Sequence, residues 1–85
     1  MKEFSYTITD PLGIHARPAG MLVKCTKAYD SEIILCKEGH CADAKRLLSV
    51  MGLGIRAGDR VEFRITGIDE DAALAGVKDF CQETL

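Results

Sequence analysis

A histidine and an arginine two residues apart, His15 and Arg17, are the side chains of this sequence best suited to carry out chemistry. Neutral imidazole is a competent nucleophile toward phosphorus near neutral pH, and a guanidinium binds two phosphate oxygens at once. A phosphoryl group could therefore be accepted on a ring nitrogen of His15 and stabilised there by Arg17. A lone His-x-Arg pair is more often a helix-capping histidine beside a solvated arginine. The surrounding residues must therefore decide between a phosphoryl acceptor and a helix cap.

The residues on either side of His15 place it at the start of a helix. Gly13 permits a tight turn, and Pro18 is tolerated in the first helical turn, where backbone N–H groups lack partners anyway. The free N–H groups, those of Ala16 and Arg17, and the positive end of the helix dipole favour a bound anion. The sequence thus predicts a phosphate site that combines an imidazole, a guanidinium and backbone N–H groups.

This helix is expected to cover residues 16–29 and to have two different faces. The apolar spacing predicts that one face is buried, through Ala19, Leu22, Val23 and Thr26. The exposed side then carries Arg17, Met21, Lys24 and Lys27. Further basic residues follow at Lys45 and Arg46, although the formal net charge is −2. This local positive charge favours an acidic partner protein and gives no general attraction to nucleic acid.

Length and composition describe one small domain, residues 1–85. With 47% apolar and 28% charged residues the chain is expected to be soluble, and no apolar run approaches the length of a membrane span. Residues 1–5 begin with alternating strand-like side chains and lack the apolar segment of a signal peptide, so a cytoplasmic location is expected. We expect no cofactor, no membrane insertion and a monomer.

The four cysteines, Cys25, Cys36, Cys41 and Cys81, lack the paired spacing of a metal site, and no metal is predicted. In a cytosolic chain they are expected to be reduced thiols. Cys36 and Cys41 flank a short turn with His40 between them, which leaves zinc binding or a disulfide open as alternatives. His40 itself is interpreted as a solvated residue at the flank of a hairpin.

Hydrophobic patterning predicts seven elements in the order β-α-β-β-α-β-α. Alternating apolar and polar residues indicate strands at 2–9 and 60–66, and a further strand is expected at 32–37, in which Ile33 and Leu35 face inward. A Glu38-Gly39 turn adds a short strand that pairs with the one at 32–37. Two further helices are expected, a short one within 43–53 and a longer one from the N-cap Asp69 to near Thr84. We predict an α/β (α+β) fold, an open-faced two-layer sandwich with a four-stranded antiparallel sheet and three helices on one face.

The short helix within 43–53 has more apolar side chains than one face can bury. Val50 and Leu53 are assigned to the core. Leu47, Leu48 and Met51 are candidates for an exposed apolar patch, which in a small soluble domain more often marks a partner site than nothing. The alternative left open is that all of these side chains pack inside.

The run Gly13-Ile14-His15-Ala16-Arg17-Pro18-Ala19, the element order, the length and the run Lys45 to Gly54 together resemble HPr over essentially the whole chain. HPr is the histidine-containing phosphocarrier of the bacterial phosphoenolpyruvate-dependent sugar phosphotransferase system. The resemblance implies that enzyme I phosphorylates Nδ1 of His15, that Arg17 stabilises the phosphate, and that enzyme IIA components of sugar transporters receive it. It also implies a docking face for these partners, formed by Gly20, Met21, Lys24, Lys27, Leu47, Leu48 and Met51.

Three positions depart from the family pattern. Arg46 stands where HPr proteins of low-GC Gram-positive bacteria have a serine that a kinase phosphorylates, so this regulation is predicted to be missing, with Ser49 as a weak substitute. Leu12 replaces a hydroxyl or amide residue that can bond the phosphate, and Leu12-Gly13 also occurs in NPr, the carrier of the nitrogen phosphotransfer chain. Gly20 costs a helix about 0.5–1 kcal/mol relative to Ala, and it either admits close approach of a partner or has no role.

The leading hypothesis is therefore a phosphocarrier of sugar transport. We expect a cosubstrate and not an enzyme, because no second general acid or base accompanies His15. An NPr-like carrier of a regulatory chain is the alternative within the family. The alternative from a different class is a non-phosphorylated module that binds an anionic partner and uses His15 only as a helix cap.

Overall fold

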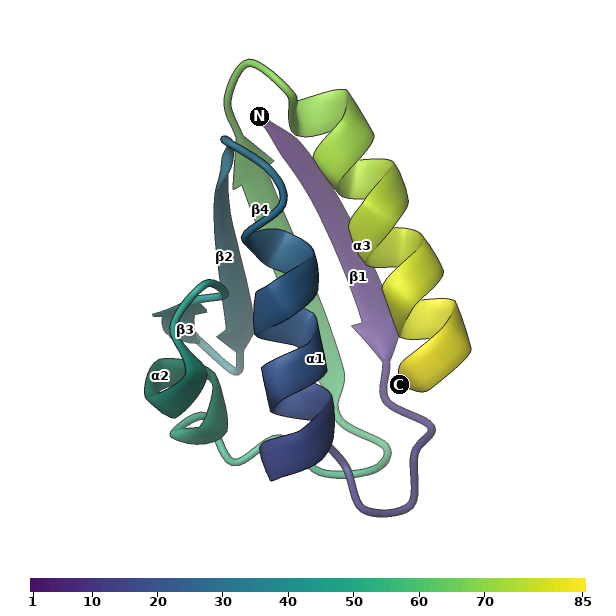
Figure 1. The fold of residues 1–85 in the computed structure, drawn as a ribbon. Helices are drawn as coiled ribbons and strands as arrows, with labels where there is room; N and C mark the ends of the chain where they lie inside the picture. Colours follow the sequence, from purple (N-terminus) through teal and green to yellow (C-terminus); the bar gives the residue numbers. More distant parts are fainter.

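Four strands form one antiparallel sheet (Figure 1). The structure is a computed structural model that describes all residues 1–85. In chain order the elements are β1 (Lys2–Thr7), α1 (Ala16–Thr26), β2 (Glu32–Lys37), β3 (His40–Asp43), α2 (Leu47–Met51), β4 (Arg60–Thr66) and α3 (Glu70–Thr84). This is the order that the sequence predicts, and the predicted bounds of β2 and β4 are confirmed.

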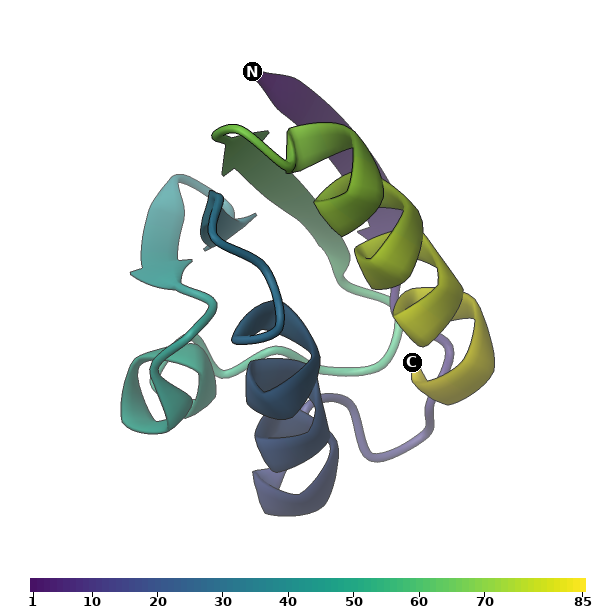
Figure 2. The same cartoon turned by 45° about the horizontal axis from the view of Figure 1, so that its top comes forward.

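The strands lie side by side in the order β1-β4-β2-β3, and every neighbouring pair is antiparallel. Because side chains alternate between the two faces, β2 and β4 turn one row of apolar residues to the same side. These residues are fully buried: Ile33, Leu35, Val61, Phe63 and Ile65. The helices lie on this side of the sheet, and the other face stays open (Figures 1 and 2). The predicted open-faced sandwich is thus confirmed.

Helices α1 and α3 supply the other half of the core. Each lays an apolar stripe on the sheet, and the buried members are Ala19, Leu22, Val23, Ala73, Val77 and Cys81. The two helices also contact each other, while the short α2 packs beside α1 and β3 (Figure 2). None of the three helices has the length and apolarity needed to cross a bilayer.

Strand β1 ends at Thr7, two residues before the predicted end. The reason is a competing acceptor from the other end of the chain. The N–H groups of Thr9 and Asp10 donate to the carbonyl oxygen of Leu85, at 2.7 and 2.9 Å, and the Thr9 hydroxyl donates to the same oxygen at 3.0 Å. These bonds turn the chain out of the sheet and into the segment that leads to His15.

Helix α1 ends at Thr26, before the predicted residue 29, and α2 has only five residues. The Thr26 hydroxyl is buried and donates to the carbonyl oxygens of Val23, at 3.1 Å, and Ala44, at 2.8 Å. Beyond this point the N–H groups of Ala28 and Tyr29 bond three residues back, as in a tightened last turn. The bond to Ala44 is long-range, so helical periodicity could not reveal this end.

The prediction that all four cysteines are reduced is wrong. Cys36 and Cys41 form a disulfide across the β2–β3 hairpin, whereas Cys25 and Cys81 are free. The Glu38-Gly39 turn places the bonded residues directly opposite each other, with Cα atoms 4.0 Å apart. The predicted register was correct. The prediction of reduced thiols was based on the reducing conditions of the cytosol, and it did not take into account that this register brings Cys36 and Cys41 together.

Asp69 occupies the N-cap position of α3, as predicted, but its side chain does not cap that helix. Its carboxylate instead accepts hydrogen bonds from the N–H groups of Asp30 and Ser31, both at 2.8 Å, and from the Ser31 hydroxyl. It thereby ties the start of α3 to the turn before β2. The bond from the Ser31 hydroxyl, followed by that from the Asp30 N–H, holds the pKa of this carboxyl below its usual value.

Asp69→Asn is expected to destabilise the protein at neutral pH and to flatten its loss of stability in acid. A lowered pKa means that the carboxylate stabilises the fold above the unfolded pKa of about 3.9, and that this stabilisation disappears as the pH falls through the folded-state pKa. Urea midpoints measured from pH 7 to pH 3 should converge for the two proteins. Asp79→Asn, at an exposed position of α3, is the control. Parallel curves for Asp69→Asn and the parent would contradict the assignment.

Candidate functional site

His15 is the N-cap residue of α1, with an extended backbone at φ −107° and ψ −171°. Its carbonyl oxygen accepts the first helical hydrogen bond, from the Ala19 N–H at 2.9 Å. The imidazole makes no capping hydrogen bond, and the residue is exposed. A histidine whose role was to cap the helix would bond the free N–H groups of the first turn. The ring is therefore positioned by its backbone and open to a reaction partner.

Unpaired donor groups follow His15 in the first turn of α1. The N–H groups of Ala16 and Arg17 donate to no acceptor in the protein, and Pro18, the next residue, has no N–H. The first turn of α1 contains no acidic residue, and the guanidinium of Arg17 forms no ion pair. The predicted combination of imidazole, guanidinium and free N–H groups is thus present at the start of one helix.

A surface hollow of about 480 Å³ lies beside these groups. Its lining comes from both ends of the chain and from α1, namely Asp10, Leu12, His15, Arg17, Pro18, Met21, Glu83 and Thr84. Leu12 is 73% exposed and adds an apolar wall, while its N–H donates to the side chain of Asp10 at 2.9 Å. The hollow has room for a phosphoryl group, and its opening is wide enough for a partner to approach.

Gly13 fixes the loop that delivers His15 to this place. Its φ of +66° is a left-handed conformation, and a Cβ built on it would lie 2.5 Å from the carbonyl oxygen of Ile55 and 2.7 Å from Cα of Arg56. The following N–H, that of Ile14, donates to the same Ile55 oxygen at 3.1 Å. The two loops therefore touch backbone to backbone, which only glycine allows at this position.

Two residues that position the site carry no signal in the local sequence. The carbonyl oxygen of Leu85 holds Thr9 and Asp10 at the start of the loop, and that of Ile55 holds its end. Both contacts are made by backbone atoms of residues far away in the sequence. Only the glycine at position 13 hinted that another segment passes close by.

The predicted docking residues gather on α1 and α2, which contact each other. Lys24 and Lys27 are exposed and form no ion pair. The exposed apolar side chains beside them, here called the apolar patch, are Met21 (45% exposed), Leu47 (40%), Leu48 (82%) and Met51 (37%). The prediction that Val50 is core is confirmed, while Leu53 is only half-buried. A second hollow, lined in part by Lys27, Leu47 and Leu48, joins the basic and apolar parts.

Two further basic residues and a glycine complete this surface. Lys45 is not free, because its Nζ donates to the carbonyl oxygen of Tyr29 at 2.7 Å and so binds the turn that follows α1. Arg46 is exposed at the N-cap of α2, with Nε 3.8 Å from a carboxylate oxygen of Asp43. At Gly20 an added Cβ would meet nothing within 4 Å, so no contact inside the protein requires this glycine.

The arrangement is suited to receiving a phosphoryl group. His15 has a nucleophilic ring, and the groups around it stabilise negative charge. The two carboxylates that line the hollow, Asp10 and Glu83, form no ion pair with His15. No group of three or more His, Cys, Asp or Glu side chains is placed to hold a metal ion.

Comparisons with known proteins lead to the same chemistry. A family model described as "PTS HPr component phosphorylation site" matches residues 2–83. Phosphocarrier protein HPr of Mycoplasma genitalium is 39% identical over 79 residues, covering 92% of this chain and 90% of that protein. The crystal structure of HPr-C-His from Thermoanaerobacter tengcongensis matches with a TM-score of 0.93 at 31% identity, covering 98% of this chain and 93% of that one.

An HPr dimer from Thermoanaerobacter tengcongensis also matches, with a TM-score of 0.78 at 31% identity over 98% of this chain and 95% of that one. The family model, the sequence relative and both structures agree over nearly the full length of the chain. On these grounds the chain belongs to the HPr family, the phosphocarriers of the phosphotransferase system.

Proposed function

We propose that this protein carries a phosphoryl group on His15, receives it from phosphorylated enzyme I and passes it to enzyme IIA components of sugar transporters. The exposed imidazole of His15, beside two free backbone N–H groups and an unpaired guanidinium, is the observation that carries the proposal. Membership of a family of phosphocarriers supports it. In this role the protein is a cosubstrate that is charged and discharged, and not a catalyst.

Each transfer exchanges one N–P bond for another. Nδ1 of His15 attacks the phosphorus atom of the donor phosphohistidine, and the donor N–P bond breaks as the new one forms. No water enters, and the donor imidazole leaves with its electron pair. The phosphoryl oxygens then face Arg17 and the N–H groups of Ala16 and Arg17, which stabilise their charge. Transfer to the acceptor repeats the same exchange.

The partners would dock on the basic and apolar residues of α1 and α2 beside His15. Lys24 and Lys27 offer free positive charge to an acidic surface, and the apolar patch offers area that becomes buried on contact. The absence of any internal neighbour at Gly20 leaves this part of α1 open to a partner's backbone. The monomer that the sequence predicts stays a prediction, to be measured by light scattering.

Leu48→Asp is expected to weaken docking without affecting the fold. Leu48 is 82% exposed, so its substitution removes little internal packing. Loss of an apolar anchor and gain of a negative charge on a basic face should raise the KM of enzyme I for this protein about tenfold or more, with an unchanged thermal midpoint. Ile68→Asp is the matched control, because Ile68 is 95% exposed between β4 and α3. Equal KM values for the two variants would contradict the placement of the docking face.

Arg46 stands at the position where related HPr proteins have a serine that a regulatory kinase phosphorylates. Arg46 has no hydroxyl group to accept the phosphoryl group that a serine kinase transfers, and its positive charge does not imitate phosphoserine. We therefore expect that an HPr serine kinase with ATP leaves this protein unmodified under conditions that fully label an HPr with serine at this position. Efficient labelling on α2, with Ser49 as the available hydroxyl, would contradict this expectation.

The decisive experiment for the proposal is phosphorylation by enzyme I. The purified protein is incubated with phosphoenolpyruvate and a catalytic amount of enzyme I, and its intact mass is read before and after brief acid treatment. We expect a mass increase of one phosphoryl group that acid removes, as for a phosphohistidine. Parallel reactions with the nitrogen-system enzyme I test the NPr-like alternative. Absence of labelling by both enzymes would overturn the proposal in favour of a binding module.

A further inference from the structure

The disulfide in the β2–β3 hairpin lies on the open face of the sheet, whereas His15 lies at the start of α1, on the face that the helices cover. Cys36 and Cys41 are bonded and directly opposite in the register. The neighbouring Leu35 is buried beneath the helices, so the side chain of Cys36 turns to the open face. There its register partner on the neighbouring strand β4 is Glu62, and Cys36 lies outside the main hydrophobic core.

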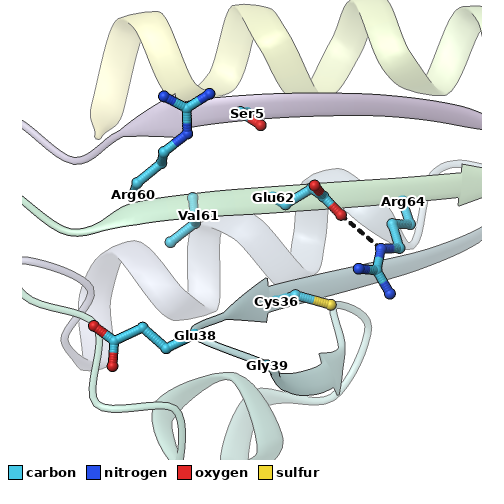
Figure 3. A pocket seen from close by; sticks show the side chains of 8 residues that line it. All are labelled: Ser5, Cys36, Glu38, Gly39, Arg60, Val61, Glu62 and Arg64. Carbon is cyan, nitrogen blue, oxygen red and sulfur yellow. Dashed lines mark hydrogen bonds and ion pairs between the residues drawn. The ribbon is translucent and has the colours of Figure 1, made fainter.

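The two bonded cysteines differ in access. Cys36 is 5% exposed, while Cys41, on the edge strand β3, is an exposed residue. Cys36 lines a hollow of about 200 Å³ whose charged lining residues are Glu38, Arg60, Glu62 and Arg64. Figure 3 shows its sulfur on the side of Glu62 and Arg64, with Arg60 and Glu38 at the other end of the hollow. The two acids and two bases balance in charge, and Glu62 and Arg64 are bonded at 2.6 Å. Access, and not local charge, therefore decides which sulfur an incoming thiolate can reach.

Contacts other than this bond also hold the fold around the hairpin. The bond closes a short loop, with a sequence separation of 5, so it removes less chain entropy from the unfolded state than a long-range disulfide does. The segment after β3 has its own anchors, because Ala44 is fully buried and its N–H donates to the carbonyl oxygen of Ile33 at 2.9 Å. Exposed disulfides that contribute little to stability are the ones that cellular dithiols reduce.

We propose that Cys36–Cys41 is a reversible thiol–disulfide exchange site for a dithiol protein, which attacks it at Cys41. A thiolate of the dithiol attacks Sγ of Cys41, and a mixed disulfide forms as the bond to Cys36 breaks. Cys36 leaves as a thiolate and takes up a proton. The second thiol of the partner loses its proton and attacks its own sulfur in the mixed disulfide, which releases Cys41 as a thiolate that is protonated in turn. The hairpin pair gains two electrons, and the partner dithiol is oxidised to a disulfide.

The remaining cysteines provide an internal comparison. Cys81 is fully buried, and burial, with a smaller contribution from Cys25, raises the pKa of its thiol to about 12. Burial also raises the pKa of Cys25. Thiols of this kind are poor nucleophiles near neutral pH, because little thiolate is present. Exchange at the protein surface should therefore involve the hairpin pair alone.

The test traps the intermediate with a thioredoxin whose second active-site cysteine is replaced by serine. Native protein that has been oxidised with glutathione disulfide is mixed with this trap, and the adduct is digested without reduction and mapped by mass spectrometry. We expect a mixed disulfide on Cys41 in at least tenfold excess over Cys36. The Cys25→Ser/Cys81→Ser variant should give the same adduct, and the Cys36→Ser/Cys41→Ser variant should give none.

Three results would overturn the proposal. One is that the native protein still has four alkylatable thiols, counted after unfolding, when it has been incubated with excess glutathione disulfide. Another is a disulfide that unmodified thioredoxin reduces only after the protein is unfolded, which would make the bond a permanent structural one. The third is an adduct that forms mainly on Cys36. Because none of these measurements involves phosphate, their outcome is independent of phosphoryl transfer at His15.

Discussion

Replacing His15 with alanine is expected to abolish phosphoryl acceptance and to leave the fold unchanged. The imidazole supplies the nucleophile of the proposed site, so without it no N–P bond can form there. Its side chain is exposed and makes no capping bond with α1. The free energy of unfolding should therefore change by no more than about 0.5 kcal/mol. Intact mass after incubation with phosphoenolpyruvate and enzyme I, together with a thermal unfolding curve, measures both effects.

The chain offers a matched control in its second histidine. His40 is exposed at the hairpin between β2 and β3, away from the start of α1. His40→Ala should accept a full phosphoryl group at the rate of the parent protein. Label that persists in His15→Ala, or that is lost in His40→Ala, would place the phosphoryl group elsewhere and refute the assignment.

Gly13→Ala is expected to destabilise the protein strongly and to impair phosphorylation as well. A left-handed φ of +66° costs an alanine about 1–2 kcal/mol, and the Cβ would also overlap backbone atoms of Ile55 and Arg56. Backbone cannot move aside as a side chain does, so the two loops must separate. We expect a loss of about 2–4 kcal/mol in the free energy of unfolding and a thermal midpoint lower by at least about 10 °C.

Gly54→Ala is the control that separates the cost of the left-handed φ from the cost of the Cβ overlap. Gly54 has a similar φ of +61°, but a Cβ there would meet nothing within 4 Å. It should lose only the conformational part, about 1–2 kcal/mol, and should keep most of its rate of phosphorylation. Gly13→Ala should in addition slow phosphorylation in the folded population, because displacement of this loop shifts His15 relative to Arg17. Equal losses of stability in the two variants would show that the contact with Ile55 is not tight.

Local patterns in the sequence were sufficient for most of the fold. Strict alternation located β4, and the expectation that Ile33 and Leu35 face inward placed β2. The Glu38-Gly39 turn gave the correct register of the hairpin. Gly13 and Pro18 located the start of α1 because both residues restrict the backbone directly. Each of these signals acts within a few residues, which is the range over which sequence determines conformation without knowledge of the fold.

Features that depend on distant partners could not be predicted in this way. Asp69 was placed correctly, but the hydrogen bonds of its side chain go to residues 38 and 39 positions earlier. The loop before His15 is held by Leu85, 76 positions after Thr9. The prediction for the cysteines was wrong for another reason. The register that pairs Cys36 with Cys41 was predicted correctly, but their oxidation state was not.

Two of the four side chains in the apolar patch are methionines, Met21 and Met51. Methionine is unbranched and polarisable, so it can change rotamer to fit differently shaped surfaces at little cost. Such a face adapts to several partners in turn but discriminates poorly among them. Recognition would then rest on Lys24 and Lys27, whose attraction to acidic surfaces acts at longer range and is screened by salt. As the ionic strength rises, discrimination between partners at this face should therefore be lost at a lower salt concentration than binding itself.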